Sequence, residues 1–143
     1  MIACFGDSIT AGHPGVSYIK HMQQNKICQN FGLGGDTLTG MSKRIISFLK
    51  ASTCNEFIIE IGTNDILLPF LSTYSRAWSK TVKRIISRGG IPLENAQSFE
   101  YEYKKLLNRL LSSGKTMKLI NIPCISEDPQ CELNNQVWFN TLK

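Results

Sequence analysis

A serine lies at the end of the first apolar segment of the chain. Ile2-Ala3-Cys4-Phe5 is followed directly by Gly6-Asp7-Ser8. A buried strand that ends this way carries a serine hydroxyl to the open edge of a sheet, where the start of a helix favours an anion. Ser8 is therefore a candidate nucleophile whose amide can also stabilise an oxyanion. A simple N-cap serine is the alternative, and Asp7 either braces the turn or contacts substrate.

Two further glycine-containing turns follow, Gly34-Gly35-Asp36-Thr37 and Gly62-Thr63-Asn64-Asp65. The first lacks the third glycine of a dinucleotide-binding loop and the lysine of a P-loop. A bare glycine-rich turn still presents N–H groups that suit either a phosphate or an oxyanion. Asn64 is either a turn asparagine or a side-chain donor to a developing oxyanion.

These turns follow predicted strands. Apolar runs that alternate with amphipathic stretches of this length predict right-handed crossovers and a parallel sheet in a three-layer α/β/α sandwich. Ligands gather at the carboxyl ends of such strands, where Ser8, Gly35 and Asn64 all lie. We predict strands over 2–5, 27–31, 57–61 and 118–122, and helices over 16–24, from the N-cap Thr37 through Leu49, 72–87, 95–113 and 133–143.

The three motifs resemble the first three conserved blocks of the SGNH (GDSL) hydrolase superfamily in their order and spacing. That superfamily comprises serine esterases, lipases, thioesterases and carbohydrate deacetylases with a flavodoxin-like fold. The resemblance implies that Ser8 is the nucleophile and that Ser8, Gly35 and Asn64 form the oxyanion hole. It also implies a small-molecule ester substrate, an acyl or acetyl ester of a lipid, thioester or carbohydrate, and no metal or organic cofactor.

The chain departs from the family pattern at the fourth block. Family members carry an Asp-x-x-His near the C-terminus, whereas the two histidines here are His13 and His21. We expect His13 to be a loop residue beside the pocket and His21 to lie on an exposed helix face. We also expect residues 1–143 to form a single domain that lacks the last strand and helix, with the general base supplied by a histidine beyond Lys143.

The composition of the chain is typical of a globular protein. The 143 residues are 42% apolar, and no apolar run approaches the ~20 residues of a membrane span. No signal peptide is visible, which favours a cytoplasmic location. The cysteines are scattered without a C-x-x-C pair, which argues against zinc and for free thiols in a reducing compartment. They are Cys4, Cys28, Cys54, Cys124 and Cys131.

The net charge of +5 comes mainly from cations at 43–44, 80–88 and 104–109. We interpret them as solvated helix faces and expect no nucleic-acid partner, because no aromatic residues interleave with the charges. Attraction to an acidic substrate or a phosphate headgroup remains the alternative.

Substrate contacts are predicted for Asp7, Asp65 and Phe70. The segment Leu67–Leu71 contains Pro69 and is expected to be a loop that either lines an acyl pocket or packs on the core. A missing last strand would leave apolar surface uncovered and favour a homodimer. Two other functions stay open: a binding module that has lost its base, and a flavodoxin-like phosphate or nucleotide binder.

Overall fold

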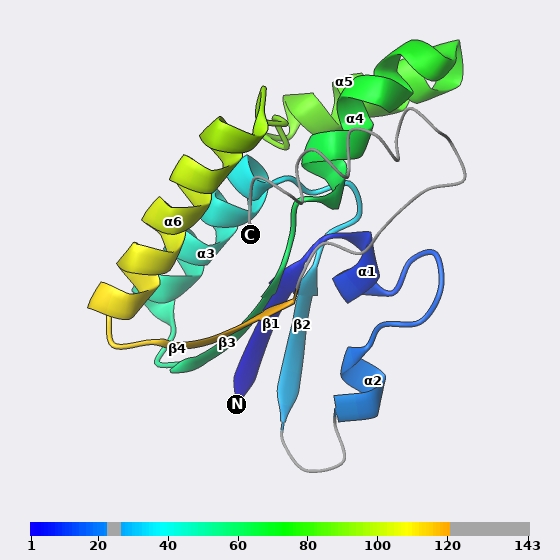
Figure 1. The fold of residues 1–143 in the computed structure, drawn as a ribbon. Helices are drawn as coiled ribbons and strands as arrows, with labels where there is room; N and C mark the ends of the chain where they lie inside the picture. The colour runs from blue at the N-terminus through cyan, green and yellow to red at the C-terminus, as the bar shows by residue number, and fades with distance from the viewer. Residues whose placement is uncertain (23–26, 121–143) are drawn as a thin grey trace.

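Four parallel strands form the centre of the molecule (Figure 1). The structure is a computed structural model, and it describes residues 1–22 and 27–120. The strand order is β2-β1-β3-β4, which places β1 in the interior of the sheet and explains why its whole length is buried. The strands are β1 (Ile2–Gly6), β2 (Cys28–Gly32), β3 (Glu56–Glu60) and β4 (Thr116–Ile120).

Helices cover both faces of this sheet. The longer pair, α3 and α6, packs on one face, while α1 and α2 lie on the other, and α4 and α5 extend past the carboxyl ends of the strands (Figure 1). This confirms the predicted α/β sandwich with a parallel sheet. The helices are α1 (Ser8–Ala11), α2 (Ile19–Met22), α3 (Leu38–Ala51), α4 (Thr63–Tyr74), α5 (Arg76–Ser87) and α6 (Ala96–Ser112).

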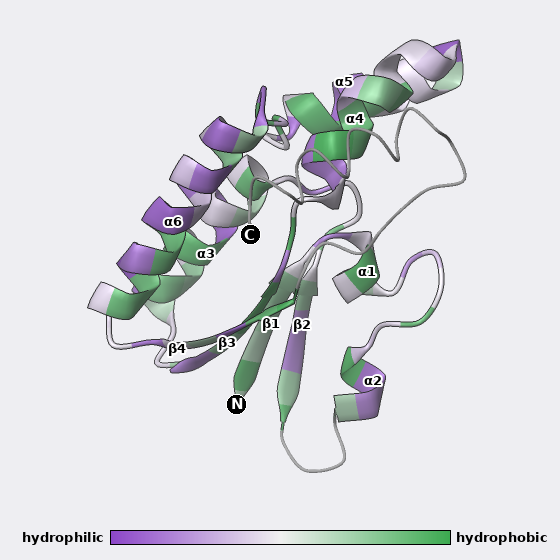
Figure 2. Cartoon of the chain, viewed as in Figure 1, coloured by the Kyte–Doolittle hydropathy of each residue, from purple (hydrophilic) through white to green (hydrophobic). Residues whose placement is uncertain are grey.

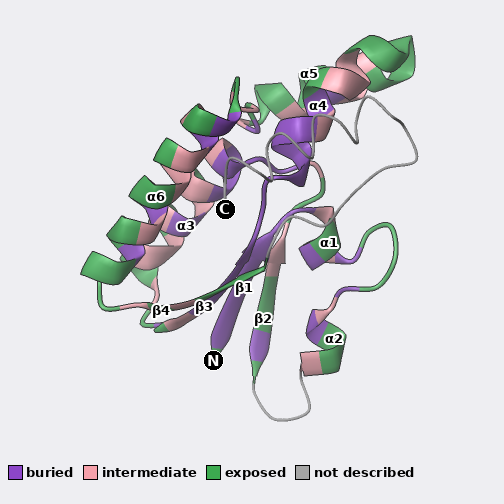
Figure 3. Ribbon diagram, viewed as in Figure 1, coloured by how far each residue is buried: buried purple, intermediate pink, exposed green. Residues whose placement is uncertain are grey.

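The larger core lies between the sheet and the α3–α6 layer (Figures 2 and 3). Phe5 is its centre: it stacks on Phe31 with ring centroids 4.8 Å apart and contacts Phe48 edge-on at 5.4 Å. Alternation along β1 sends Ile2 and Cys4 to the opposite face, where a smaller core packs under α2. Each face of the sheet therefore has its own apolar layer.

Most of the predicted helices and strands begin and end within two residues of the observed bounds. Thr37 caps α3, as predicted, and its hydroxyl accepts a hydrogen bond from the Gly40 amide at 3.5 Å. Asn95 caps α6 in the same way through the Ser98 amide at 2.8 Å. Helix α2 begins later than predicted, at Ile19. The predicted helix over 133–143 lies outside the described residues.

The prediction of a loop over Leu67–Leu71 is wrong. These residues lie within α4, which continues through Pro69. Helix α4 packs against α5 and buries Leu68, and this tertiary packing outweighs the hydrogen bond that proline cannot donate. The predicted single helix over 72–87 is also wrong, because the chain is extended at Ser75 and starts again as α5.

The structure bears on two predictions made from composition, one about membrane-spanning segments and one about the cysteines. Within residues 1–22 and 27–120, no helix is long and apolar enough to cross a membrane. Cys4, Cys28 and Cys54 are buried free thiols, while Cys124 and Cys131 lie outside the described residues.

Replacement of Phe5 by alanine tests the centre of the core. We expect Phe5→Ala to lower the free energy of unfolding by about 3–5 kcal/mol, because it removes a buried ring and leaves a cavity. Tyr101→Ala is the control, since that side chain is 67% exposed and should cost little. Urea unfolding followed by circular dichroism measures both, and an equal cost would contradict the assignment of the core.

Candidate active site

The first turn positions Ser8 through its neighbour Asp7. The Asp7 carboxylate caps α1 by accepting a hydrogen bond from the Ile9 amide at 2.9 Å. Ser8 is therefore the first residue of α1, and the alternative interpretation of Ser8 as an N-cap is wrong. The carboxylate takes this role because helix N-terminal amides need an acceptor. Ser8 is half-buried, and among the described residues its hydroxyl has no hydrogen-bond partner.

The second turn depends on Gly35. Its φ of +79° is in the left-handed region that favours glycine. A Cβ atom at Gly35 would lie 2.6 Å from Cδ1 of Ile85, because the C-terminal part of α5 packs over this turn. Both constraints select glycine, and they fix the backbone just before Asp36.

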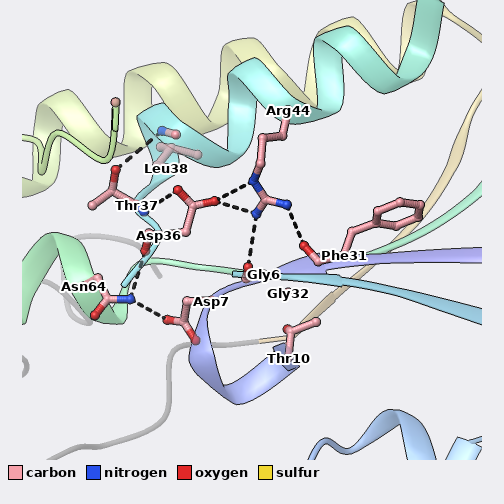
Figure 4. Close-up of polar contacts among 12 residues, drawn as sticks. Gly6, Asp7, Thr10, Phe31, Gly32, Asp36, Thr37, Leu38, Arg44 and Asn64 are labelled. Atoms are coloured by element: carbon pink, nitrogen blue, oxygen red, sulfur yellow. Dashed lines mark hydrogen bonds and ion pairs between the residues drawn. The ribbon is translucent and has the colours of Figure 1, made fainter. Parts of the chain in front are cut away.

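Asn64, in the first turn of α4, joins the other two turns (Figure 4). Its Nδ2 donates to Oδ2 of Asp7 at 3.2 Å and to the Asp36 carbonyl at 2.9 Å. Asp7 precedes Ser8 and Asp36 follows Gly35, so one amide group links the three predicted motifs. Both amide hydrogens are engaged in these contacts.

Arg44 on α3 holds the same region from the other side (Figure 4). Its Nε donates to Asp36 Oδ2 at 2.9 Å, its Nη1 to the Phe31 carbonyl at 2.6 Å and its Nη2 to the Gly6 carbonyl at 3.3 Å. The guanidinium thus ties the ends of β1 and β2 to the Gly35 turn. Sequence reasoning grouped Arg44 with the solvated cations, and for this residue that interpretation is wrong.

Glu60 is a site residue that sequence reasoning missed. It ends β3 and is 1% exposed. Its Oε2 accepts hydrogen bonds from the Thr10 hydroxyl at 3.1 Å and the Asp7 amide at 3.5 Å. Its Oε1 has no hydrogen-bond partner among the described residues. The available signal was an acid inside the apolar run Phe57–Ile61, because a charged residue is rarely fully buried unless it has a partner.

The surroundings of the Asp7 carboxyl raise its pKa. Burial raises the pKa of Asp7 to about 7, and the adjacent Glu60 charge and hydrogen bond add to the effect against the opposing bond from the Ile9 amide. Asp36 also contributes through its charge. A carboxyl group in this position can therefore change its charge near neutral pH.

Both carboxylate oxygens of Asp65 accept hydrogen bonds from backbone amides. Its Oδ2 accepts from the Leu38 amide at 2.9 Å and its Oδ1 from the Leu93 amide at 3.1 Å, so it fixes the start of α3 and the connector before α6. Burial raises the pKa of Asp65 to about 7. Its contact with substrate stays a prediction.

Phe70 and the histidines lie apart from the contacts that join the three turns. The Phe70 ring packs on Tyr74 with centroids 5.9 Å apart, and its place in an acyl pocket stays a prediction. An open pocket of about 390 Å³ lies elsewhere, where α3 meets the sheet beside Phe31. His13 and His21 are exposed; the His13 backbone amide donates to the Ser8 carbonyl at 3.2 Å. Among residues 1–22 and 27–120, no group of three or more metal-ligating side chains is gathered.

Comparison with known proteins gives a consistent picture of the fold. No family model and no curated protein sequence matches the chain. Solved structures do: a member of the lipolytic G-D-S-L family from Veillonella parvula has a TM-score of 0.66 at 20% identity over 99% of this chain and 69% of its own.

Two other structures are similar to the chain. A catalytic mutant of the acetylxylan esterase Axe2 from Geobacillus stearothermophilus has a TM-score of 0.62 at 17% identity, over 99% of this chain and 68% of its own. TesA has a TM-score of 0.57 at 18% identity, over 98% of this chain and 71% of its own. The chain therefore has an SGNH hydrolase-like fold, as the three motifs predicted.

Replacement of Glu60 by glutamine tests the buried carboxyl pair. The folded pKa of Asp7, about 7, exceeds its unfolded value of 3.8. The folded state therefore holds the proton more tightly, and stability falls as pH rises from about 4 to about 7. Glu60→Gln removes the neighbouring charge and lowers the Asp7 pKa, so the fall should shrink by about 1.4 kcal/mol for each pH unit by which that pKa drops.

The measurement is urea unfolding at pH 5 and pH 8. Asp65 contributes equally to both proteins, so the difference between their pH dependences isolates Glu60. Glu94→Gln serves as the matched control, because Glu94 is exposed on the connector before α6. If Glu60→Gln keeps the wild-type pH dependence, Glu60 does not influence Asp7.

Proposed function

We propose that the chain is an ester hydrolase of the SGNH type that forms an acyl-enzyme on Ser8. The observation that carries this proposal is the link through Asn64, which holds the turns of Ser8 and Gly35 together at the carboxyl ends of the strands. The similarity to structures of a G-D-S-L family member and an acetylxylan esterase supports the same class of reaction.

In the proposed reaction, the Ser8 hydroxyl oxygen attacks the ester carbonyl carbon while a general base takes the hydroxyl proton. The carbonyl oxygen becomes an oxyanion, which the amides of Ser8 and Gly35 and the side chain of Asn64 stabilise. Collapse of this intermediate breaks the bond to the alcohol, which leaves with the proton returned by the base. Water, deprotonated by the same base, then attacks the acyl carbon, so that the carboxylic acid leaves and the Ser8 hydroxyl is restored. A removed oxyanion donor typically costs about 10²–10³ in rate, so each of the three donors matters.

Asn64 must exchange one hydrogen bond to take part. Its Nδ2 contact with Asp7 is the longer, at 3.2 Å, and that with the Asp36 carbonyl is 2.9 Å. We assign the Asp7 contact as the hydrogen bond that is replaced by one to the oxyanion. The Asp36 contact is kept and holds the amide in its orientation. Protonation of Asp7 weakens its hold on the amide, and its pKa of about 7 makes this possible near neutral pH.

A second candidate function is ester binding without turnover. The observation that favours it is the unpartnered Ser8 hydroxyl among the described residues, together with the exposure of His13 and His21. A serine hydroxyl without a base is a poor nucleophile at neutral pH. Proteins that lose a catalytic triad retain roughly 10³–10⁴-fold catalysis over water from the oxyanion hole and binding alone.

Labelling with a fluorophosphonate separates the two functions. The reagent reacts when an activated serine oxygen displaces fluoride from phosphorus, and mass spectrometry locates the modified peptide. We expect modification at Ser8 that Ser8→Ala abolishes and that Ser113→Ala, a change at the exposed end of α6, leaves intact. If His13 is the base, His13→Gln abolishes labelling as well. A folded protein that remains unlabelled contradicts the hydrolase and favours the binding module.

A further inference from the structure

Helix α5 and its flanks carry an unbalanced positive charge. Between Asp65 and Glu94 the sequence contains cations and no acid. The cations are Arg76, Lys80, Lys83, Arg84 and Arg88. Within the described part of the chain none of them forms an ion pair. Because several are four residues apart, they repel one another along the helix, which costs stability unless an anion offsets it.

The two faces of α5 differ in their surroundings. Val82 is buried, and Ile85 packs over the Gly35 turn, so this part of the apolar face rests on the protein. The cations repeat at intervals of three and four residues on the other face and are exposed. This helix is therefore held in place while its basic face is directed to solvent.

Two exposed aromatic residues lie at the end of the hairpin formed by α4 and α5. All residues over 73–78 are exposed, and this end of the hairpin lies away from the sheet (Figures 1 and 3). Tyr74 is 67% exposed and Trp78 is 42% exposed. Tyrosine and tryptophan prefer the boundary between water and lipid, because each combines an apolar ring with a polar group.

The cations of α6 provide an internal contrast. Lys104 pairs with Glu100 and Lys105 with Glu102. Their charge is offset on their own helix, and no comparable acid is available on α5. Among the described residues, positive charge without an ion-pair partner is thus concentrated on one element, and exposed aromatic rings lie at its start.

We propose that α5 and the adjoining turn dock on an anionic lipid surface. The basic face contacts lipid phosphate groups, while Tyr74 and Trp78 enter the headgroup region at the end of the hairpin. A nucleic acid is the less suitable anion, because the rings gather at one end of the hairpin and do not interleave with the cations as stacking on bases requires. This surface is independent of the proposed hydrolysis and does not require Ser8 to react.

Vesicle binding by the full chain tests the proposal. Vesicles of phosphatidylcholine with phosphatidylglycerol should bind the protein, and added salt should weaken binding; vesicles of phosphatidylcholine alone should bind much less. Trp78 fluorescence should shift to shorter wavelength on binding. The other tryptophan, Trp138, is replaced by phenylalanine so that the signal comes from Trp78.

Matched triple variants locate the surface. Lys80→Gln, Lys83→Gln and Arg84→Gln together should weaken vesicle binding by roughly 100-fold, since each cation near an anionic membrane contributes about fivefold. The control removes the same charge from α6 with Lys104→Gln, Lys105→Gln and Arg109→Gln, and should change binding by less than tenfold.

Three results would overturn the proposal. They are no binding to phosphatidylglycerol vesicles, equal losses in the two triple variants, and tighter binding to a short DNA duplex than to the vesicles. Circular dichroism confirms that each variant is folded. Fluorophosphonate labelling of the same samples reports on Ser8 separately, so a failure of docking is distinguishable from a failure of the proposed hydrolysis.

Discussion

The Asn64 side chain is the interaction on which the geometry of the site depends. Its amide spans the Asp7 carboxylate and the Asp36 carbonyl, which belong to turns separated by 28 or more positions from it in sequence. The strands end at one edge of the sheet in any parallel fold, but a shared edge alone does not fix the turns relative to one another. A buried amide with both hydrogens engaged does so, because a misplaced turn would leave a polar group unsatisfied.

Buried and half-buried charged side chains stabilise this arrangement. Arg44 offsets the charge of Asp36 and binds two strand-end carbonyls, so its burial is compensated by several hydrogen bonds. Asp7 and Glu60 differ, since these two acids lie together and neither forms an ion pair with a cation in the part of the chain that the structure describes. Their burial works against folding, and such costs are typical of sites in which chemistry determines which residues are present. The contacts around Asp36 are therefore reinforced by an ion pair, whereas those around Asp7 depend on two acids without one.

Helix α5 covers the Gly35 turn, and its two faces have separate roles. Ile85 packs against the Gly35 turn, so α5 contributes to the site through its apolar face. The opposite face of the same helix carries the cations that form no ion pair within residues 1–22 and 27–120. One helix therefore connects the interior of the candidate site to a charged outer surface, and the two faces follow from the 3.6-residue period of its sequence.

The strands, the parallel sheet and the order of the three motifs can be predicted from the amino-acid sequence alone. Short-range patterns carry this information: an apolar run ending at Gly6, and capping residues such as Thr37 and Asn95. The same local rules failed at Pro69, because they count the hydrogen bond that proline lacks and cannot count the burial of Leu68 against the protein.

Which polar residues meet at the site depends on how the chain packs in three dimensions. Glu60 contacts Asp7 across 53 positions and Arg44 contacts the Gly6 carbonyl across 38. No local spacing encodes such pairs, so one of these residues looked like a break in an apolar strand and the other like a surface cation. Hydrogen-bonding partners are selected when distant segments pack together. A single sequence therefore reveals the motifs, but not the contacts that hold them in place.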